Sequence, residues 1–251
     1  MPSTIHDVIR VSGVSLATVS KYLNGKHVKD STAEKIEAAI SKLNYIPNGI
    51  ARSLATSKTK TVGIVLPYIA NRFASEVTAA FISELKSNGY ASLLVDCGGD
   101  SLNEIGCAEF LLEKKVDALF SIPLTDDTKL VGFAKSHNIP IVFADHLIQG
   151  NDADTVLSDN ESAMYNAVMR LYGLGHRKIA MFGSNISAGM SERTAGYVKA
   201  MKKLGLYNDA LYIDFKSHQN DESLNKLISK LLKKHAPSAM ISANYELTPY
   251  F

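Results

Sequence analysis

Residues 4–25 read Thr-Ile-His-Asp-Val-Ile-Arg-Val-Ser-Gly-Val-Ser-Leu-Ala-Thr-Val-Ser-Lys-Tyr-Leu-Asn-Gly, and this stretch decides the fold of the N-terminal part of the chain. Thr4 is a good N-cap for a first helix. Ile5, Val8 and Ile9 follow at positions i, i+3 and i+4, which gives that helix one apolar face. The stretch therefore begins with a short amphipathic helix.

A tight corner and a second helix follow. Gly13 tolerates the left-handed turn that such a corner needs, and Ser15 is the N-cap of the next helix. Val19 and Leu23 are spaced to point inward, and Asn24-Gly25 ends the helix. Two short helices joined by a glycine-containing turn are the geometry that places the second helix in the major groove of DNA. Small, hydroxylic and cationic side chains remain on its outer face, suited to base edges and phosphates: Leu16, Ala17, Thr18, Ser20 and Lys21.

A third helix is expected over the first two. Ser31-Thr32-Ala33-Glu34 has the pattern of a capping box and predicts the N-terminus of this helix at Ser31. Apolar residues with helical spacing follow, at Ile36, Ala39, Ile40 and Leu43. Tyr45-Ile46-Pro47 ends the helix, because the residue before a proline is pushed out of the helical region. Periodicity alone leaves an ordinary helical hairpin as the alternative.

From Thr61 onward the hydrophobic pattern changes to short apolar runs separated by helical segments. One such segment carries Val77, Phe81 and Leu85 and ends at Asn88-Gly89. Alternation of strands and helices predicts parallel sheets, with ligands at the carboxyl ends of the strands. The predicted strands are Thr61–Pro67, Ala91–Asp96, Ala118–Ile122, Pro140–Ala144, Thr155–Ser158, Lys178–Phe182, Leu211–Phe215 and Ser238–Ala243.

The positive charge is concentrated near the N-terminus. Residues 1–60 hold nine Lys and Arg against four Asp and Glu, a net +5, whereas the whole chain carries only +2. A basic N-terminal part on a mildly acidic remainder is typical of a protein that binds nucleic acid. Cys97 and Cys107 lack metal-ligand spacing and are expected to be buried thiols in a reducing compartment. With neither a signal peptide nor a membrane-spanning stretch in the sequence, we expect a cytoplasmic protein.

Three separate blocks resemble the lactose/galactose-repressor family of bacterial transcription regulators. They are Thr18-Val-Ser-Lys-Tyr-Leu-Asn-Gly25, Leu43-Asn-Tyr-Ile-Pro-Asn48 and Ile50-Ala-Arg-Ser-Leu54, and they occur in the family's order and spacing. The resemblance implies an all-α helix-turn-helix domain followed by an α/β core of two lobes, like those of periplasmic sugar-binding proteins. The corresponding ranges are 1–47 for the DNA-binding domain, 48–60 for a hinge helix and linker, 61–158 for the first lobe and 159–251 for the second. Family members continue beyond residue 251, so we expect the second lobe to be incomplete. Whether that reflects a truncated gene product or a fragment stays open.

The resemblance also implies how DNA is read. Leu16 and Ala17 match positions through which family members vary operator choice, and Lys21 stands where the family usually has Arg. Leu54 matches a hinge leucine that is wedged into the minor groove, with Ala51 and Arg52 in the same block. For Leu54 the alternative is packing against the lobe. The remaining DNA contacts are assigned to phosphates, with capping as the alternative role for Ser15: Ser15, Thr18, Ser20 and Asn24.

A small-molecule site is implied in the core. Asp145, Arg193 and Asn244 match family positions that bind the hydroxyl groups of sugars or similar polar groups. Tyr68, Asn71 and Phe73 follow the first strand of the lobe and are expected to line the same cleft. The alternative for Asp145 is an ordinary turn residue. Three substitutions depart from the family pattern: Tyr245 for an aspartate, Arg72 for a proline and Ala74 for an aromatic residue.

Together these features predict a transcription regulator, a repressor, that binds a pseudo-palindromic operator as a homodimer under the control of a sugar or sugar derivative. A cytoplasmic sugar-binding module and a non-inducible truncated regulator are the alternatives. An α/β enzyme is a further rival, but the sequence has no dinucleotide-binding glycine motif, P-loop or nucleophile elbow. We therefore expect no catalytic residue, no cofactor and no metal, and partners limited to DNA, the effector and a second copy of the chain, without a membrane.

Overall fold

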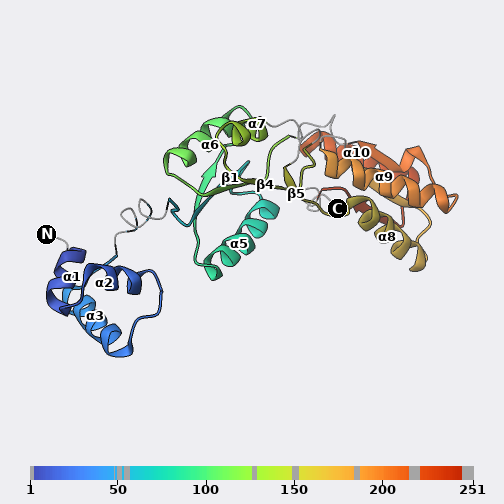
Figure 1. Cartoon of the computed structure of the whole chain (residues 1–251). Coiled ribbons are helices and arrows are strands. Elements are labelled where there is room, and N and C mark those ends of the chain that lie inside the picture. The colour runs from blue at the N-terminus through green and yellow to red at the C-terminus, as the bar shows by residue number, and fades with distance from the viewer. Residues whose placement is uncertain are drawn as a thin grey trace. The chain divides into compact units, whose positions relative to one another are not determined.

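The computed structural model describes residues 3–47, 49, 53, 57–125, 129–148, 153–183, 187–214 and 221–244. The chain divides into two compact units, residues 1–59, here called the head, and residues 60–251, here called the core unit (Figure 1). Among the described residues, no helix combines the length and apolar character needed to cross a membrane.

Within residues 3–47 the head folds as three helices, as the sequence predicts. Its helices are α1 (Ile5–Ser12), α2 (Leu16–Leu23) and α3 (Asp30–Leu43). The Thr4 hydroxyl accepts a hydrogen bond from the Asp7 amide and the Asp7 carboxylate accepts one from the Thr4 amide, so α1 begins with a capping box. Gly13 ends α1 at a φ of 66°, in the left-handed region. Val8, Val19 and Ile36, one from each helix, are fully buried in the head's core.

The predicted start of the third helix is wrong by two residues, since the N-cap is Lys29 and not Ser31, and the predicted capping box does not form. Lys29 occupies the N-cap position without a side-chain hydrogen bond, and Asp30 is the first helical residue. The Lys29 carbonyl accepts hydrogen bonds from the amides of Thr32 and Ala33, at 2.8 and 2.9 Å. Ser31 therefore lies inside the first turn, where its hydroxyl is no longer in the position of a cap.

The core unit contains two parallel sheets, and all eight predicted strands are present. The strands are β1 (Thr61–Leu66), β2 (Ala91–Asp96), β3 (Ala118–Ser121), β4 (Ile141–Ala144), β5 (Asp154–Val156), β6 (Ile179–Gly183), β7 (Tyr212–Asp214) and β8 (Ala239–Ser242). The first sheet has the order β2-β1-β3-β4-β5 and the second has the order β7-β6-β8. Every strand pairing within the described ranges is parallel.

Helices cover both faces of each sheet. They are α5 (Arg72–Ser87), α6 (Asn103–Glu113), α7 (Leu130–Ser136), α8 (Asn160–Gly173), α9 (Ala188–Lys203) and α10 (Asp221–His235). In the first lobe, Figure 1 shows α6 and α7 on one side of the sheet and α5 on the other. On the α5 side, Phe81 stacks on Phe120 with ring centroids 4.3 Å apart. In the second lobe, α8 and α9 pack on one face and α10 packs on the other.

The topology of the first sheet determines where a ligand would bind. From β1 the chain crosses to β2 on one side, and from β2 it crosses back to β3 on the other side of β1. Loops leaving the carboxyl ends of β1 and β3 therefore diverge, and open α/β sheets bind ligands in the crevice that this leaves.

Candidate functional site

The outer face of α2 presents most of the residues predicted to contact DNA. Leu16, Ala17 and Lys21 are exposed, and half of the Leu16 side chain is accessible. Thr18 and Ser20 are partly exposed on the same helix. Apolar, hydroxylic and cationic groups thus share one accessible helix, a combination that serves both base edges and phosphate oxygens.

Two of the predicted phosphate contacts also shape the ends of α2. The Ser15 hydroxyl accepts a hydrogen bond from the Thr18 amide at 3.4 Å and lies 3.0 Å from the Thr18 hydroxyl. At the other end, the side-chain Nδ2 of Asn24 donates to the Ser20 carbonyl at 2.9 Å. Ser15 and Asn24 are both exposed, so their capping role leaves them accessible to DNA.

A hydrogen bond between α2 and α3 is one contact that sequence reasoning missed. Tyr22 Oη donates a hydrogen bond to Glu37 on α3, and this bond raises the pKa of Tyr22. The sequence offers little signal for this pair, because the two residues are 15 positions apart on different helices. The predicted hinge contacts Ala51, Arg52 and Leu54 lie outside the described residues.

All six residues predicted for the small-molecule site line one cavity of about 350 Å³ in the core unit, here called the cleft. Its walls are formed by residues that follow β1, β3, β4, β6 and β8: Pro67, Tyr68, Asn71, Phe73, Ala74, Ile122, Pro123, Leu124, Asp145, His146, Ser187, Gly189, Met190, Arg193 and Asn244. The volume lies within the range of small-molecule sites. Its apolar walls carry one carboxylate, one guanidinium and several neutral polar groups, which suits a small polar ligand.

Asp145 is held in an unusual backbone conformation. Its φ is 70°, in the left-handed region, and its amide donates to the Val156 carbonyl of β5 at 3.0 Å. Non-glycine residues adopt this region at some cost and are found there mainly where the surrounding structure enforces it. His146, the next residue, has a buried Nδ1 without a hydrogen-bond partner in the part of the chain described. The nearest Asp145 carboxylate oxygen is 3.9 Å away. A polar ligand or a water molecule would satisfy this nitrogen.

Arg193 is fixed by a network that spans the second lobe. Its Nε donates to Asn160 Oδ1 and its Nη1 to the Ala243 carbonyl, each at 2.8 Å. Asn160 is 5% exposed and its own amide nitrogen donates to Glu192 at 3.0 Å. Two of the three guanidinium nitrogens are thereby engaged, which restricts the rotamers of Arg193 and pre-organises it at the cleft.

The N-terminal ends of two helices also reach the cleft. Asn71 caps α5 by accepting a hydrogen bond from the Ala74 amide at 2.9 Å. Ser187 caps α9 in the same way for Met190, at 3.4 Å. Sequence reasoning missed His146, Ser187 and Met190 as lining residues, although a serine just before a helical segment is a readable N-cap signal.

The loop that carries Tyr68 is tied to the loop after β2. Asp96 accepts hydrogen bonds from the amides of Ile69 and Gly98, at 2.9 and 2.7 Å. These two bonds lower the pKa of Asp96. Gly99 donates to the Pro67 carbonyl at 2.9 Å, and a side chain at Gly99 would overlap the Tyr68 ring.

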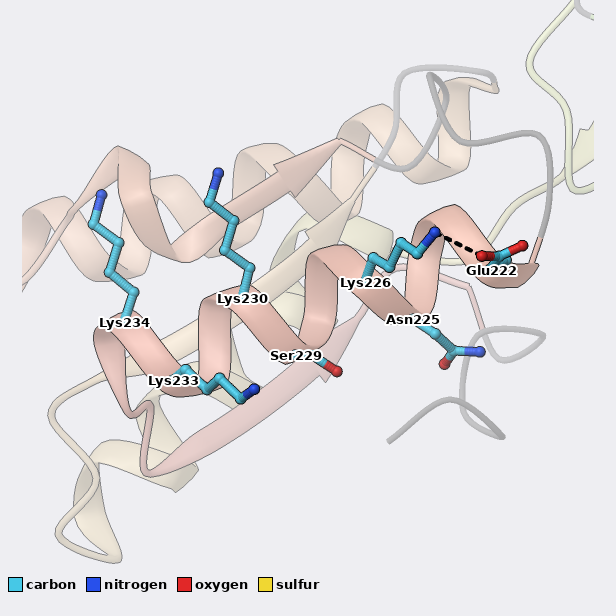
Figure 2. A pocket seen from close by; sticks show the side chains of 7 residues that line it. All are labelled: Glu222, Asn225, Lys226, Ser229, Lys230, Lys233 and Lys234. Atoms are coloured by element: carbon cyan, nitrogen blue, oxygen red, sulfur yellow. Dashed lines mark hydrogen bonds and ion pairs between the residues drawn. The ribbon is translucent and has the colours of Figure 1, made fainter.

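A larger hollow of about 610 Å³ lies along α10, away from the cleft. All seven of its lining residues belong to this one helix and are exposed, and Lys226 is paired with Glu222 at 2.6 Å (Figure 2). Side chains of one exposed helix offer a ligand no opposing wall. We therefore place the candidate small-molecule site in the cleft.

Two family models match the chain. Residues 4–48 match "Bacterial regulatory proteins, lacI family", and residues 59–248 match "Periplasmic binding proteins and sugar binding domain of LacI family". The boundary between them falls next to the division between head and core unit.

Relatives along most of the chain are transcription regulators. The probable HTH-type transcriptional regulator EndR of Paenibacillus polymyxa is 32% identical over 97% of this chain and 73% of its own length. The HTH-type transcriptional repressor PurR of Vibrio campbellii is 34% identical over 81% of this chain and 62% of its own. Among solved structures, the Lac repressor dimer bound to operator and the anti-inducer ONPF matches with a TM-score of 0.78 and 27% identity, covering 97% of this chain and 74% of that one. A complex of the transcriptional regulator CelR with cellobiose matches with a TM-score of 0.61 and 25% identity, covering 96% and 73%.

Proposed function

Because the chain belongs to the LacI family of bacterial regulatory proteins, we propose that it represses transcription by binding a pseudo-palindromic operator as a homodimer. In this proposal residues 1–47 bind DNA, residues 48–60 form a hinge, and the lobes 61–158 and 159–251 bind a small effector. The protein acts in the cytoplasm, where the bacterial chromosome is. The cleft has a binding role and not a catalytic one.

The observation that carries the DNA-binding part is the exposed face of α2 on a basic three-helix head. A second helix set against a first by a glycine turn is the major-groove geometry, and a twofold dimer presents two such helices to two half-sites. Lys21 offers a point charge and not the two-pronged donor of arginine, so we expect it to tolerate more than one base. The hinge residues Ala51, Arg52 and Leu54 enter this proposal on their sequence alone.

The observation that carries the effector part is the convergence of Asp145, Arg193 and Asn244 on one cleft with Tyr68, Asn71 and Phe73. A carboxylate accepts hydrogen bonds from the hydroxyl groups of a carbohydrate and a guanidinium donates hydrogen bonds to them. The apolar walls of the cleft suit its C–H faces. We therefore propose a sugar or a sugar derivative as the effector.

The DNA-binding part is tested by selecting an operator from a randomised duplex pool with the full chain and measuring binding by fluorescence anisotropy. Lys21→Ala should cost about 1–3 kcal/mol on the selected half-site and much less on random duplex. Lys42→Ala, which removes the same charge from an exposed position on α3, is the matched control and should affect both duplexes alike. A loss for Lys21→Ala that is equal on both duplexes would reduce Lys21 to a phosphate contact. Failure to select any sequence would contradict operator binding.

The effector part is tested by thermal unfolding of the full chain with a panel of monosaccharides, disaccharides and sugar phosphates. A ligand that binds the native state raises the melting temperature in proportion to its occupancy. Asp145→Asn should abolish the rise given by the active sugar. Asp154→Asn, at an exposed carboxylate on β5, should retain it. If the active sugar still raises the melting temperature of the Asp145→Asn variant, the sugar binds elsewhere.

A further inference from the structure

The two cysteines, 10 positions apart in sequence, lie in contact in the first lobe. Cys97 is the residue directly after β2, and Cys107 lies on α6. The Cys97 thiol donates to the Cys107 sulfur at an Sγ–Sγ distance of 3.3 Å. Both are free thiols, Cys97 buried at 3% exposure and Cys107 half-buried. A disulfide needs about 2.05 Å between the sulfurs, so closure requires an approach of roughly 1 Å.

We propose that Cys97 and Cys107 are a reversible dithiol pair that hydroperoxides oxidise to an intramolecular disulfide, which clamps the loop behind Tyr68. Disulfides in reducing compartments are uncommon unless they are transient and redox-sensing. A reduced pair already in contact, at the edge of a candidate ligand site, meets that description. In the described ranges no group of three or more potential metal ligands includes the two thiols.

Accessibility sets the order of the chemistry. Cys107 is the more exposed thiol, and burial together with the neighbouring Cys107 raises the pKa of Cys97. The Cys107 thiolate attacks one peroxide oxygen, an S–O bond forms, the O–O bond breaks, and hydroxide leaves and is protonated to water. Cys97 then loses its proton, and its sulfur attacks the sulfenic sulfur of Cys107. The S–S bond forms as the S–O bond breaks, and the second hydroxide leaves with that proton as water. Two thiols are oxidised by two electrons and one hydrogen peroxide is reduced to two waters.

The disulfide would act on the cleft through contacts already in place. The Cys97 amide donates to the Leu66 carbonyl at 2.8 Å, and the Gly99 amide donates to the Pro67 carbonyl at 2.9 Å. The Tyr68 ring lies so close to Gly99 that a side chain there would overlap it. The disulfide would anchor Cys97 to α6 and so limit the opening of the β2–α6 loop, which buttresses the Tyr68 wall of the cleft.

The chemical part is tested on the reduced full chain by adding hydrogen peroxide, blocking free thiols with N-ethylmaleimide and measuring the intact mass. The expected product has lost two hydrogen atoms, takes up no maleimide, migrates as a monomer on a non-reducing gel and regains two maleimide sites after dithiothreitol. Cys107→Ser, at the half-buried position, should fold and leave Cys97 free for alkylation under denaturing conditions. Two maleimide adducts after peroxide, or a disulfide found only between chains, would overturn the pairing.

The clamp is tested by hydrogen exchange on the same reduced and oxidised samples. Amides in residues 68–71 and 97–103 should exchange more slowly after oxidation, and dithiothreitol should reverse the change. The Cys107→Ser variant treated with peroxide should show no slowing. A disulfide that forms without altering exchange in either segment would overturn the link to the cleft. Both readouts are independent of DNA binding and of any sugar, so they stand or fall separately from the proposed function.

Discussion

The candidate DNA contacts described in the head lie within ten consecutive residues, 15–24, whereas the lining of the cleft comes from five segments between Pro67 and Asn244. In the head, the contact side chains point away from the core that holds the helices together. Leu16 and Lys21 are exposed, and the buried positions are taken by residues such as Val19. The candidate contacts and the residues that stabilise the head therefore lie on opposite faces of one helix.

In the cleft the same separation does not exist. Arg193 binds the Ala243 carbonyl and Asn160, and Asp145 is strained while its amide bonds to the neighbouring strand. Arg193 joins distant segments of the fold through its side chain, and Asp145 does so through its backbone amide. A head of this kind can change specificity by surface substitution at little cost. A cleft of this kind changes affinity and stability together.

The largest expected effect is at the contact between α8 and α9, the two helices that position Arg193. A Cβ at Gly196 would lie 2.2 Å from the Glu161 carbonyl oxygen, so Gly196→Ala forces the helices apart. We expect a loss of about 1–3 kcal/mol in the free energy of unfolding of the core unit, measured by urea denaturation followed by circular dichroism.

The matched control makes the same change where there is space. A Cβ at Gly106 on α6 meets no atom within 4 Å, so Gly106→Ala should stabilise by about 0.4–1 kcal/mol through the entropy of the unfolded chain. Equal effects from both variants would mean that the close approach of α8 and α9 does not exist.

The next effect tests whether recognition and stability are coupled in the cleft. Asn160→Ala leaves Arg193 Nε and the Glu192 carboxylate without their shared partner. An unsatisfied buried group costs about 1–3 kcal/mol, and solvent reaching the partly exposed Arg193 should keep the loss near the lower end. Denaturant midpoints measure this loss, with Asn225→Ala on the exposed face of α10 as control, expected within about 0.5 kcal/mol of wild type. If the Asn160→Ala protein is as stable as wild type and keeps its sugar-induced rise in melting temperature, recognition and stability are not coupled in the cleft.

The elements that the sequence predicts well are those whose signal is local. All eight strands are recoverable because each is a short apolar run bounded by polar residues, glycine or proline. The start of α3 shows the limit of local patterns. Ser31 and Glu34 have the composition of a capping box, but the helix begins at Asp30 because the backbone carbonyl of Lys29 already accepts its first hydrogen bonds.

The candidate site residues also divide into those with a local sequence signal and those without one. The residues of α2 follow from helical periodicity alone, since its outer face is whatever Val19 and Leu23 leave exposed. Asn160 and His146 gave no signal, because their roles depend on partners brought close by the fold. Asn160 meets Arg193 across 33 positions, and the lack of a partner for His146 Nδ1 is a property of the folded environment.

A smaller effect tests the independence of the two faces of α2. Leu16→Ala removes apolar surface from a side chain that is half exposed, so the free energy of unfolding should change by less than about 0.5 kcal/mol. Binding to the selected operator should fall, and the preferred base should change at the position that Leu16 contacts, as read by repeating the selection. If Leu16→Ala destabilises the head as much as Val19→Ala, the outer face is not separate from the core.

The smallest expected effect compares two carboxylates held by backbone amides, one locally and one across the fold. Hydrogen bonds from Thr4 lower the pKa of Asp7, and those from Ile69 and Gly98 lower the pKa of Asp96. The pKa of each carboxyl is lower in the folded protein than in the unfolded one. The hydrogen bonds to each carboxylate therefore stabilise the fold fully above the unfolded pKa of about 3.9. This stabilisation is lost as the pH falls through the pKa of the folded protein. Acid titration followed by NMR amide shifts should therefore report Asp7 only at the start of α1. The titration of Asp96 should shift the amide signals of two segments, at Ile69 and at Gly98, and Asp96→Asn should remove both responses. A response at Gly98 alone would mean that Asp96 acts as locally as Asp7, and the contrast between the head and the core unit would not extend to these two carboxylates.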